Sequence, residues 1–155
     1  RNLTVVQLAP GTSDLCTSGL AITLSACLMI VCSDIGSWAF GRRWGRRPLS
    51  PISPGKTVEG ALGGCLCAMA MGEVCALVMG WPFLGLPGLL LGALVALIAM
   101  VGDLTESMMK RDAGIKDSGD VLPGHGGILD RIDSYLFTPA VVYYVIALIQ
   151  PVLVR

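Results

Sequence analysis

Three long stretches of this chain carry no charged residue, and this limits the possible folds more than any other feature. They span residues 15–33, 74–102 and 135–154. About 20 apolar residues, each rising 1.5 Å, cross the hydrocarbon core of a bilayer as a helix. With 54% hydrophobic and 14% charged residues, the chain is too apolar for a soluble domain of 155 residues. The sequence therefore predicts an all-α, polytopic integral membrane helix bundle.

Turn-forming residues divide the apolar sequence into about four predicted spans, at residues 19–40, 57–79, 88–109 and 134–153. The Gly and Pro residues of "GWPFLGLPG" separate the second span from the third, because they cannot continue a helix. Pro139 is expected to kink the fourth span or to lie in its first turn. Abundant Gly and Ala in the second and third spans favour close helix contact in lipid. We expect residues 1–155 to form one transmembrane domain.

Basic residues predict the orientation of the bundle. Apart from the two terminal arginines, every Lys and Arg lies in the predicted loops 41–56 and 110–133. With four spans these loops lie on the same side, and the positive-inside tendency makes that side cytoplasmic. We therefore expect an integral protein of the plasma or inner membrane, or an equivalent one. The alternative that these charges serve only as topology signals is left open.

Carboxylates are predicted to converge near the same end of the bundle. Asp34 and Asp103 lie eight and seven residues before Arg42 and Lys110, which places both about 10 to 12 Å inside their helix ends. Further acidic residues on this side are Glu59, Glu106, Asp130 and Asp133. Ionised groups in a membrane segment are costly unless they are paired or lie in a wet cavity. The pattern therefore predicts such a cavity.

A divalent cation would relieve the repulsion between these carboxylates. Mg²⁺ is the expected ion, since proteins normally hold it through one or two carboxylates plus substrate phosphates. The alternative is a set of salt bridges among Asp103, Glu106, Lys110, Arg131 and Asp133. Neither interpretation is excluded by the spacing alone.

The two basic loops have the composition of phosphate-binding segments. "GRRWGRRPLSPISPGKTVEG" and "GHGG" combine basic side chains with glycines that let the backbone approach a ligand. His125 is the only histidine, and a structural hydrogen bond is the alternative to a role in chemistry. The sequence contains no Ser/His/Asp or HExxH arrangement. These features favour phosphoryl or nucleotidyl transfer between a nucleotide and a charged lipid head over proteolysis, and a net charge of zero argues against nucleic acid.

Two segments resemble the phosphatidate cytidylyltransferases, also called CDP-diglyceride synthases. "SMMKRDAGIKDSGDVLPGHGGILDRIDS" is similar to their signature, and "SDIGSWAFGRRWGRRPLSPISPGKTVEGALGG" is similar to their upstream region. The resemblance implies transfer of CMP from CTP to phosphatidic acid with Mg²⁺, in one transmembrane catalytic domain. Members of the family usually carry several more helices upstream, so we expect this chain to be a C-terminal part of a longer protein. A homodimer and an additional monovalent cation are left open.

The resemblance also implies roles for individual residues. The expected catalytic group is Asp103, Asp130, Lys110, Arg131 and His125. The expected metal ligands are Asp103 and Asp130, with Asp133 and Asp34 as weaker candidates. The expected substrate-binding residues are Arg42, Lys56, Thr57, Glu59, Arg111, Lys116, Asp117, Gly126 and Gly127.

Three other functions remain as alternatives. CTP-dependent polyprenol or phytol kinases and CDP-archaeol synthases are similar over the same two segments. A cation channel or transporter would also explain carboxylates in a helix bundle. The products formed from labelled CTP distinguish the enzymes from one another, and ion flux without CTP consumption identifies a channel.

Overall fold

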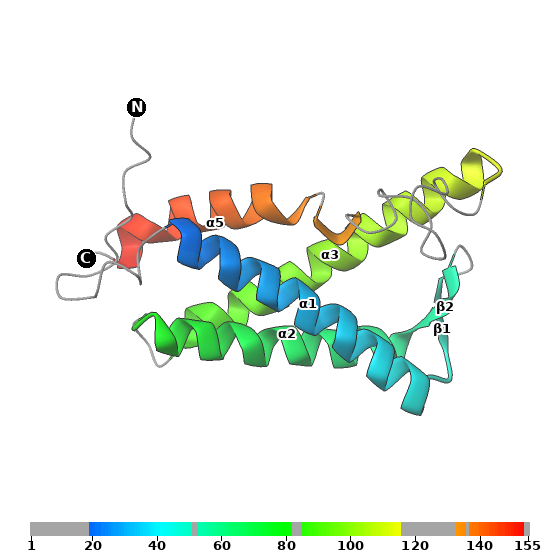
Figure 1. Cartoon of the computed structure of the whole chain (residues 1–155), viewed down its shortest axis with the longest axis horizontal. Coiled ribbons are helices and arrows are strands. Elements are labelled where there is room, and N and C mark those ends of the chain that lie inside the picture. The colour runs from blue at the N-terminus through cyan, green and yellow to red at the C-terminus, as the bar shows by residue number, and fades with distance from the viewer. Residues whose placement is uncertain (1–18, 51–52, 82–84, 116–132, 136, 154–155) are drawn as a thin grey trace.

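The computed structural model describes residues 19–50, 53–81, 85–115, 133–135 and 137–153. Within these residues four α-helices form the bundle: α1 (Gly19–Trp44), α2 (Val58–Val78), α3 (Leu86–Asp112) and α5 (Thr138–Leu153). A two-stranded ribbon, β1 (Pro48–Ser50) and β2 (Ser53–Thr57), joins α1 to α2, and the short 3-10 helix η3 (Asp133–Tyr135) precedes α5. Figure 1 shows the ribbon at one end of the bundle, beside the C-terminal half of α3.

Three of these helices are long and apolar enough to cross a membrane, namely α1, α2 and α3. The apolar part of α5 within the described residues, Thr138–Leu148, is shorter. Large apolar side chains point outward along the bundle, including Leu20, Leu90 and Leu148, which are 60% to 72% exposed. Such a surface suits lipid rather than water. The prediction of an all-α membrane bundle is therefore confirmed.

The largest differences between the helix boundaries and the predicted spans, four residues each, lie at the end of α1 and the start of α5. Helix α1 continues to Trp44 instead of ending at residue 40, because charged residues end an apolar run without ending a helix, and Arg42 and Arg43 favour the last turn. Helix α5 begins at Thr138 rather than near residue 130 or 134. Pro139 follows immediately, at a position where its missing N–H costs nothing. Asp133 therefore lies in η3 and not in the helix.

The contact between α2 and α3 depends on glycines that face each other. A Cβ atom at Gly72 would overlap the carbonyl oxygen of Gly88, and one at Gly88 would overlap that of Gly72. Gly92 lies equally close to the backbone of Ala68. The two backbones are thus in direct contact, as in other helix pairs that associate in lipid through small residues.

The apolar core lies among α1, α3 and α5. Met29 and Ile30 of α1 and Val95 of α3 are almost fully buried, and Val142 and Ile146 of α5 pack against the same cluster. This core holds α1 and α3 together, and these are the two helices that carry Asp34 and Asp103. Helix α2 packs extensively against both of them, so the core and α2 together place the two carboxylates relative to each other.

The connection from α1 to α2 is a fixed structure rather than an open loop. Strands β1 and β2 pair antiparallel, with Pro48 opposite Thr57 and Ser50 opposite Ser53. The N–H of Val58 donates to the carbonyl of Arg47 over 3.0 Å. At the start of α2 the hydroxyl of Thr57 accepts the N–H of Gly60 over 3.1 Å and caps the helix. Residues 41–56, expected to be a loop, thus comprise the end of α1 and most of the ribbon.

Replacing Thr57 with Val is expected to lower the free energy of unfolding by about 1 kcal/mol, because the N–H of Gly60 loses its acceptor. Denaturant titration in detergent micelles measures this change. Thr57→Ser keeps the hydroxyl and should stay within about 0.5 kcal/mol of the parent. A Val variant as stable as the parent would show that the cap contributes nothing.

Candidate active site

A cavity of about 470 Å³ lies where α1, α3, the start of α2 and the ribbon meet. Its volume falls in the range of about 300 to 1,000 Å³ that small-molecule sites occupy. Its polar and charged lining residues are Ser33, Asp34, Ser37, Arg42, Lys56, Thr57, Asp103 and Ser134. The apolar part of the wall includes Trp38, Leu49, Ala61, Ala99 and Met100. Charged and neutral groups from segments 100 residues apart in the sequence thus share one cavity.

The two carboxylates that helix geometry placed at matching depths do line this cavity together. Asp34 comes from α1 and Asp103 from α3. Among the described residues, no three Asp, Glu, His or Cys side chains come together closely enough to hold a metal ion. The two carboxylates that line the cavity match the small number of protein ligands that Mg²⁺ usually takes.

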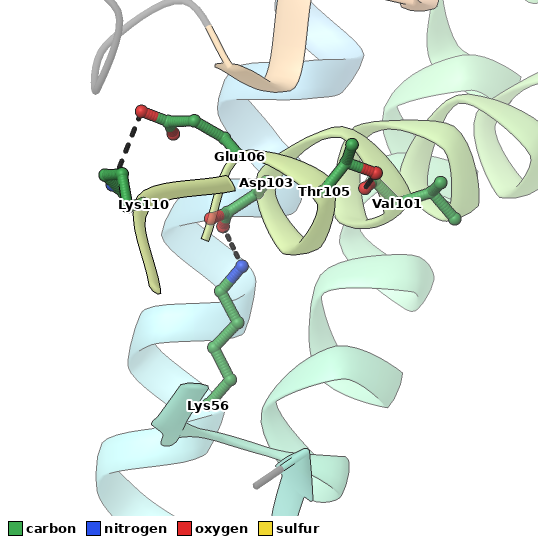
Figure 2. Close-up of polar contacts among 6 residues, drawn as sticks. All are labelled: Lys56, Val101, Asp103, Thr105, Glu106 and Lys110. Carbon is green, nitrogen blue, oxygen red and sulfur yellow. Dashed lines mark hydrogen bonds and ion pairs between the residues drawn. The ribbon is translucent and has the colours of Figure 1, made fainter. Parts of the chain in front are cut away.

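Lys56 connects the ribbon to α3 across the cavity. Its ammonium group forms an ion pair with the carboxylate of Asp103 (Figure 2). The Lys56 nitrogen is shielded from solvent, although the two side chains keep 27% and 31% of their surface exposed. A shielded ammonium group needs a counter-charge, because desolvation of an unpaired cation is costly. The pair therefore places a positive charge of the first basic segment directly beside a carboxylate of the third span.

A second ion pair lies within α3. Lys110 is 3.3 Å from Glu106, one turn earlier in the helix, and the Glu106 side chain is only 4% exposed. Neither residue lines the cavity, and Figure 2 shows Glu106 directed away from Lys56. The salt-bridge interpretation is thus right for Glu106 and Lys110. Asp103 instead forms its ion pair with Lys56, a residue that was not among the predicted salt-bridge partners.

Glu59 fixes the chain where α1 turns into the ribbon. Its carboxylate accepts the backbone N–H groups of Arg46 and Arg47, over 3.1 and 3.3 Å. Because Glu59 lies in the first turn of α2, it joins the end of one helix to the start of the next. This carboxylate orders the basic segment through backbone atoms, and its predicted part in substrate binding stays a prediction.

Arg42 reaches back along α1 toward the cavity. Its guanidinium lies 5.4 Å from the ring centroid of Trp38, one turn earlier, and both residues line the cavity. Arginine above an aromatic ring is a favourable cation–π arrangement. Trp38, Ser37 and Ser134 were not predicted as site residues. The signal for them was present, since all three lie inside the two segments that carry the family resemblance.

The remaining predicted site residues either lie away from the cavity or fall outside the described residues. Arg111 lies near the end of α3 and is exposed, and it does not line the cavity. For Asp133 only the backbone is described. Outside the described residues lie Lys116, Asp117, His125, Gly126, Gly127, Asp130 and Arg131. Their roles stay predictions.

Apolar spanning helices around a charged cavity at one end define an intramembrane binding or catalytic protein. The sequence matches the model of the cytidylyltransferase family over residues 6–149. The chain belongs to this family, which confirms the resemblance seen in the two segments.

Several relatives are named for one reaction. A phosphatidate cytidylyltransferase of Synechocystis sp. is 52% identical over 136 residues, covering 88% of this chain and 46% of that protein. One from Bacillus subtilis is 43% identical over 131 residues, covering 84% and 49%. The chain thus spans about half the length of these curated relatives. A solved structure described as an intramembrane enzyme for archaeal membrane lipid biosynthesis is 28% identical, with a TM-score of 0.56 over 81% of this chain and 76% of that one.

Proposed function

We propose that this chain forms the catalytic part of a phosphatidate cytidylyltransferase, which transfers CMP from CTP to phosphatidic acid. The products are CDP-diacylglycerol and pyrophosphate. The observation that carries the proposal is the cavity in which Asp34, Asp103, Lys56 and Arg42 meet at one end of apolar helices. It occurs in a chain whose relatives bear the name of this activity. A charged nucleotide and a lipid headgroup both suit such a place.

The reaction requires no nucleophile from the protein. An oxygen of the phosphatidate phosphate attacks the α-phosphorus of CTP, and the bond from that phosphorus to the oxygen bridging the β-phosphate breaks. Pyrophosphate leaves with the electron pair of that bond. The protein contributes by holding the two phosphates in line and by neutralising negative charge.

The positive side chains of the cavity are suited to the phosphates. Arg42 and Lys56 lie on its wall. Between them Glu59 binds the backbone N–H groups of Arg46 and Arg47, and directly after Lys56 the hydroxyl of Thr57 caps α2. A phosphate entering beside Lys56 would compete with Asp103 for the ammonium group. Lys110, Arg111, Lys116 and Arg131 are proposed to complete the phosphate contacts, and His125 to bind phosphate or orient Asp130.

The carboxylates suit Mg²⁺. Asp34 and Asp103 line the same cavity, and oxygen ligands of this kind, together with substrate phosphates, are what Mg²⁺ takes. Asp130 and Asp133 are proposed as further ligands. When bound, the ion would neutralise charge on the phosphates of CTP. This cation requirement is part of the proposal.

The cavity end of the bundle is proposed to face the cytoplasm, where CTP is found. The basic residues near the ends of α1 and α3 support this orientation, because cytoplasmic segments carry an excess of Lys and Arg. A homodimer stays a prediction.

Labelled CTP tests the proposed reaction directly. The full-length protein that contains this chain is incubated with phosphatidic acid, Mg²⁺ and CTP labelled at either the α or the γ phosphorus. We expect label in the lipid from α-labelled CTP only, because CMP is transferred. Label from the γ position alone would identify a CTP-dependent lipid kinase instead. Activity with an isoprenoid ether-lipid phosphate but not with phosphatidic acid would favour a CDP-archaeol synthase.

A further inference from the structure

The C-terminal end of α1 carries a basic and aromatic surface that the cavity does not use. We call Arg43, Trp44, Arg46 and Arg47 the arginine collar. All four residues are exposed, Trp44 by 56%, and the guanidinium of Arg43 lies 5.7 Å from the ring centroid of Trp44. None of them lines the cavity, whereas the neighbouring Arg42 does. In Figure 1 this end of α1 projects beyond α2 on the side of the ribbon.

None of the three collar arginines forms a side-chain ion pair within the described part of the chain. The ion pairs found there join Lys56 to Asp103 and Lys110 to Glu106. The carboxylate of Glu59 accepts the backbone N–H groups of Arg46 and Arg47, and its charge attracts that of Arg47 without an ion pair between their side chains. Their backbone is therefore fixed while their guanidinium groups remain available to an anionic partner.

The length of α1 places the collar at the membrane surface. A helix of 26 residues is about 39 Å long, whereas the hydrocarbon core is about 30 Å thick. If α1 starts at one surface of the core, about six residues extend beyond the other surface, and these include Arg43 and Trp44. Trp and Arg side chains are both favoured in the headgroup layer.

We propose that the arginine collar binds the headgroups of anionic phospholipids in the leaflet that surrounds this end of the bundle. Lipid phosphates lie at the depth of the collar, and guanidinium groups bind phosphate oxygens in a bidentate manner. Basic side chains next to an anionic leaflet are attracted to it. The collar thereby gathers acidic lipids beside the cavity. This inference does not depend on the proposed function, because it concerns residues outside the cavity and lipid binding rather than turnover.

Quenching of Trp44 fluorescence tests this proposal in bilayers. Residues 1–155 carry three tryptophans, so replacing Trp38 and Trp81 with Phe, together with any tryptophan outside these residues, leaves Trp44 as the only emitter. Brominated phosphatidylglycerol and brominated phosphatidylcholine are compared as quenchers at equal mole fractions. We expect a preference for phosphatidylglycerol of about fivefold or more, which falls toward one in R43Q/R46Q/R47Q and at high salt. In R43K/R46K/R47K the preference should persist in large part, because the charge is kept.

The opposite end of the bundle provides a matched control. In a W38F/W44F variant that likewise lacks any tryptophan outside residues 1–155, only Trp81 emits, and residues 74–102 around it carry no charge, so both lipids should quench it equally. Circular dichroism verifies that each variant keeps its helices. Equal quenching of Trp44 by the two lipids would overturn the proposal, as would a preference unchanged in R43Q/R46Q/R47Q. Loss of the preference on adding CTP would also overturn it, since the collar would then belong to the nucleotide site.

Discussion

Replacing Asp103 with Asn is expected to lower the rate of CDP-diacylglycerol formation by about 1,000-fold. The substitution keeps the shape of the side chain and removes its charge. In the structure that charge faces Lys56 inside the cavity, and in the proposed reaction it holds Mg²⁺. The rate is measured with α-labelled CTP across a Mg²⁺ titration, and size-exclusion chromatography in detergent verifies folding.

Glu106→Gln is the matched control for this prediction. Glu106 lies three residues further along α3 and is also paired with a lysine, but it does not line the cavity. We expect this variant to keep at least about a tenth of the parent activity, since the proposed metal and CTP sites retain their carboxylates. Equal losses in the two variants would indicate that ion pairing alone explains the effect. Activity within tenfold of the parent in Asp103→Asn would exclude Asp103 as an essential ligand.

Replacing Gly72 with Ala is expected to destabilise the bundle by about 2 to 3 kcal/mol, although Ala ordinarily favours a helix over Gly. The added Cβ atom would overlap the backbone carbonyl of Gly88. Backbone atoms cannot move aside as a flexible side chain can, so α2 and α3 must separate. The free energy of unfolding is measured by denaturant titration in mixed micelles.

Gly19→Ala makes the same chemical change at the start of α1, where a Cβ atom would meet nothing within 4 Å. Its free energy of unfolding should stay within about 0.5 kcal/mol of the parent. The close contact between α2 and α3 would be disproved if Gly72→Ala were as stable as Gly19→Ala.

Only part of the cavity could be predicted from the sequence. Counting residues from the helix ends put Asp34 and Asp103 at the same depth, because the rise per residue of a helix is constant. Counting could not identify the partner of Asp103, since Lys56 is 47 positions away and meets it only through the ribbon. Trp38 was missed although it lies in a segment that carries the family resemblance, because the sequence alone does not show which side chains of a helix line a cavity.

Two other features required the folded chain. The end of α1 at Trp44 was not visible in hydropathy, which marks where the apolar run stops and not where the backbone hydrogen bonds stop. The role of Glu59 as an acceptor for Arg46 and Arg47 depends on how the ribbon returns the chain to α2. In both cases the deciding interaction lies in the backbone.

The sequence by itself determined the three long apolar helices α1, α2 and α3, the end of the bundle at which charge collects, and the family. Those properties can be calculated from consecutive residues. The free energy of transferring an uncharged run into lipid adds up along the run, and the length of a helix is proportional to its number of residues. Only the tertiary structure decided which arginine enters the cavity, which lysine meets Asp103, and which glycines bring α2 and α3 into contact. These pairings depend on the angles at which helices cross, and packing between distant segments sets those angles.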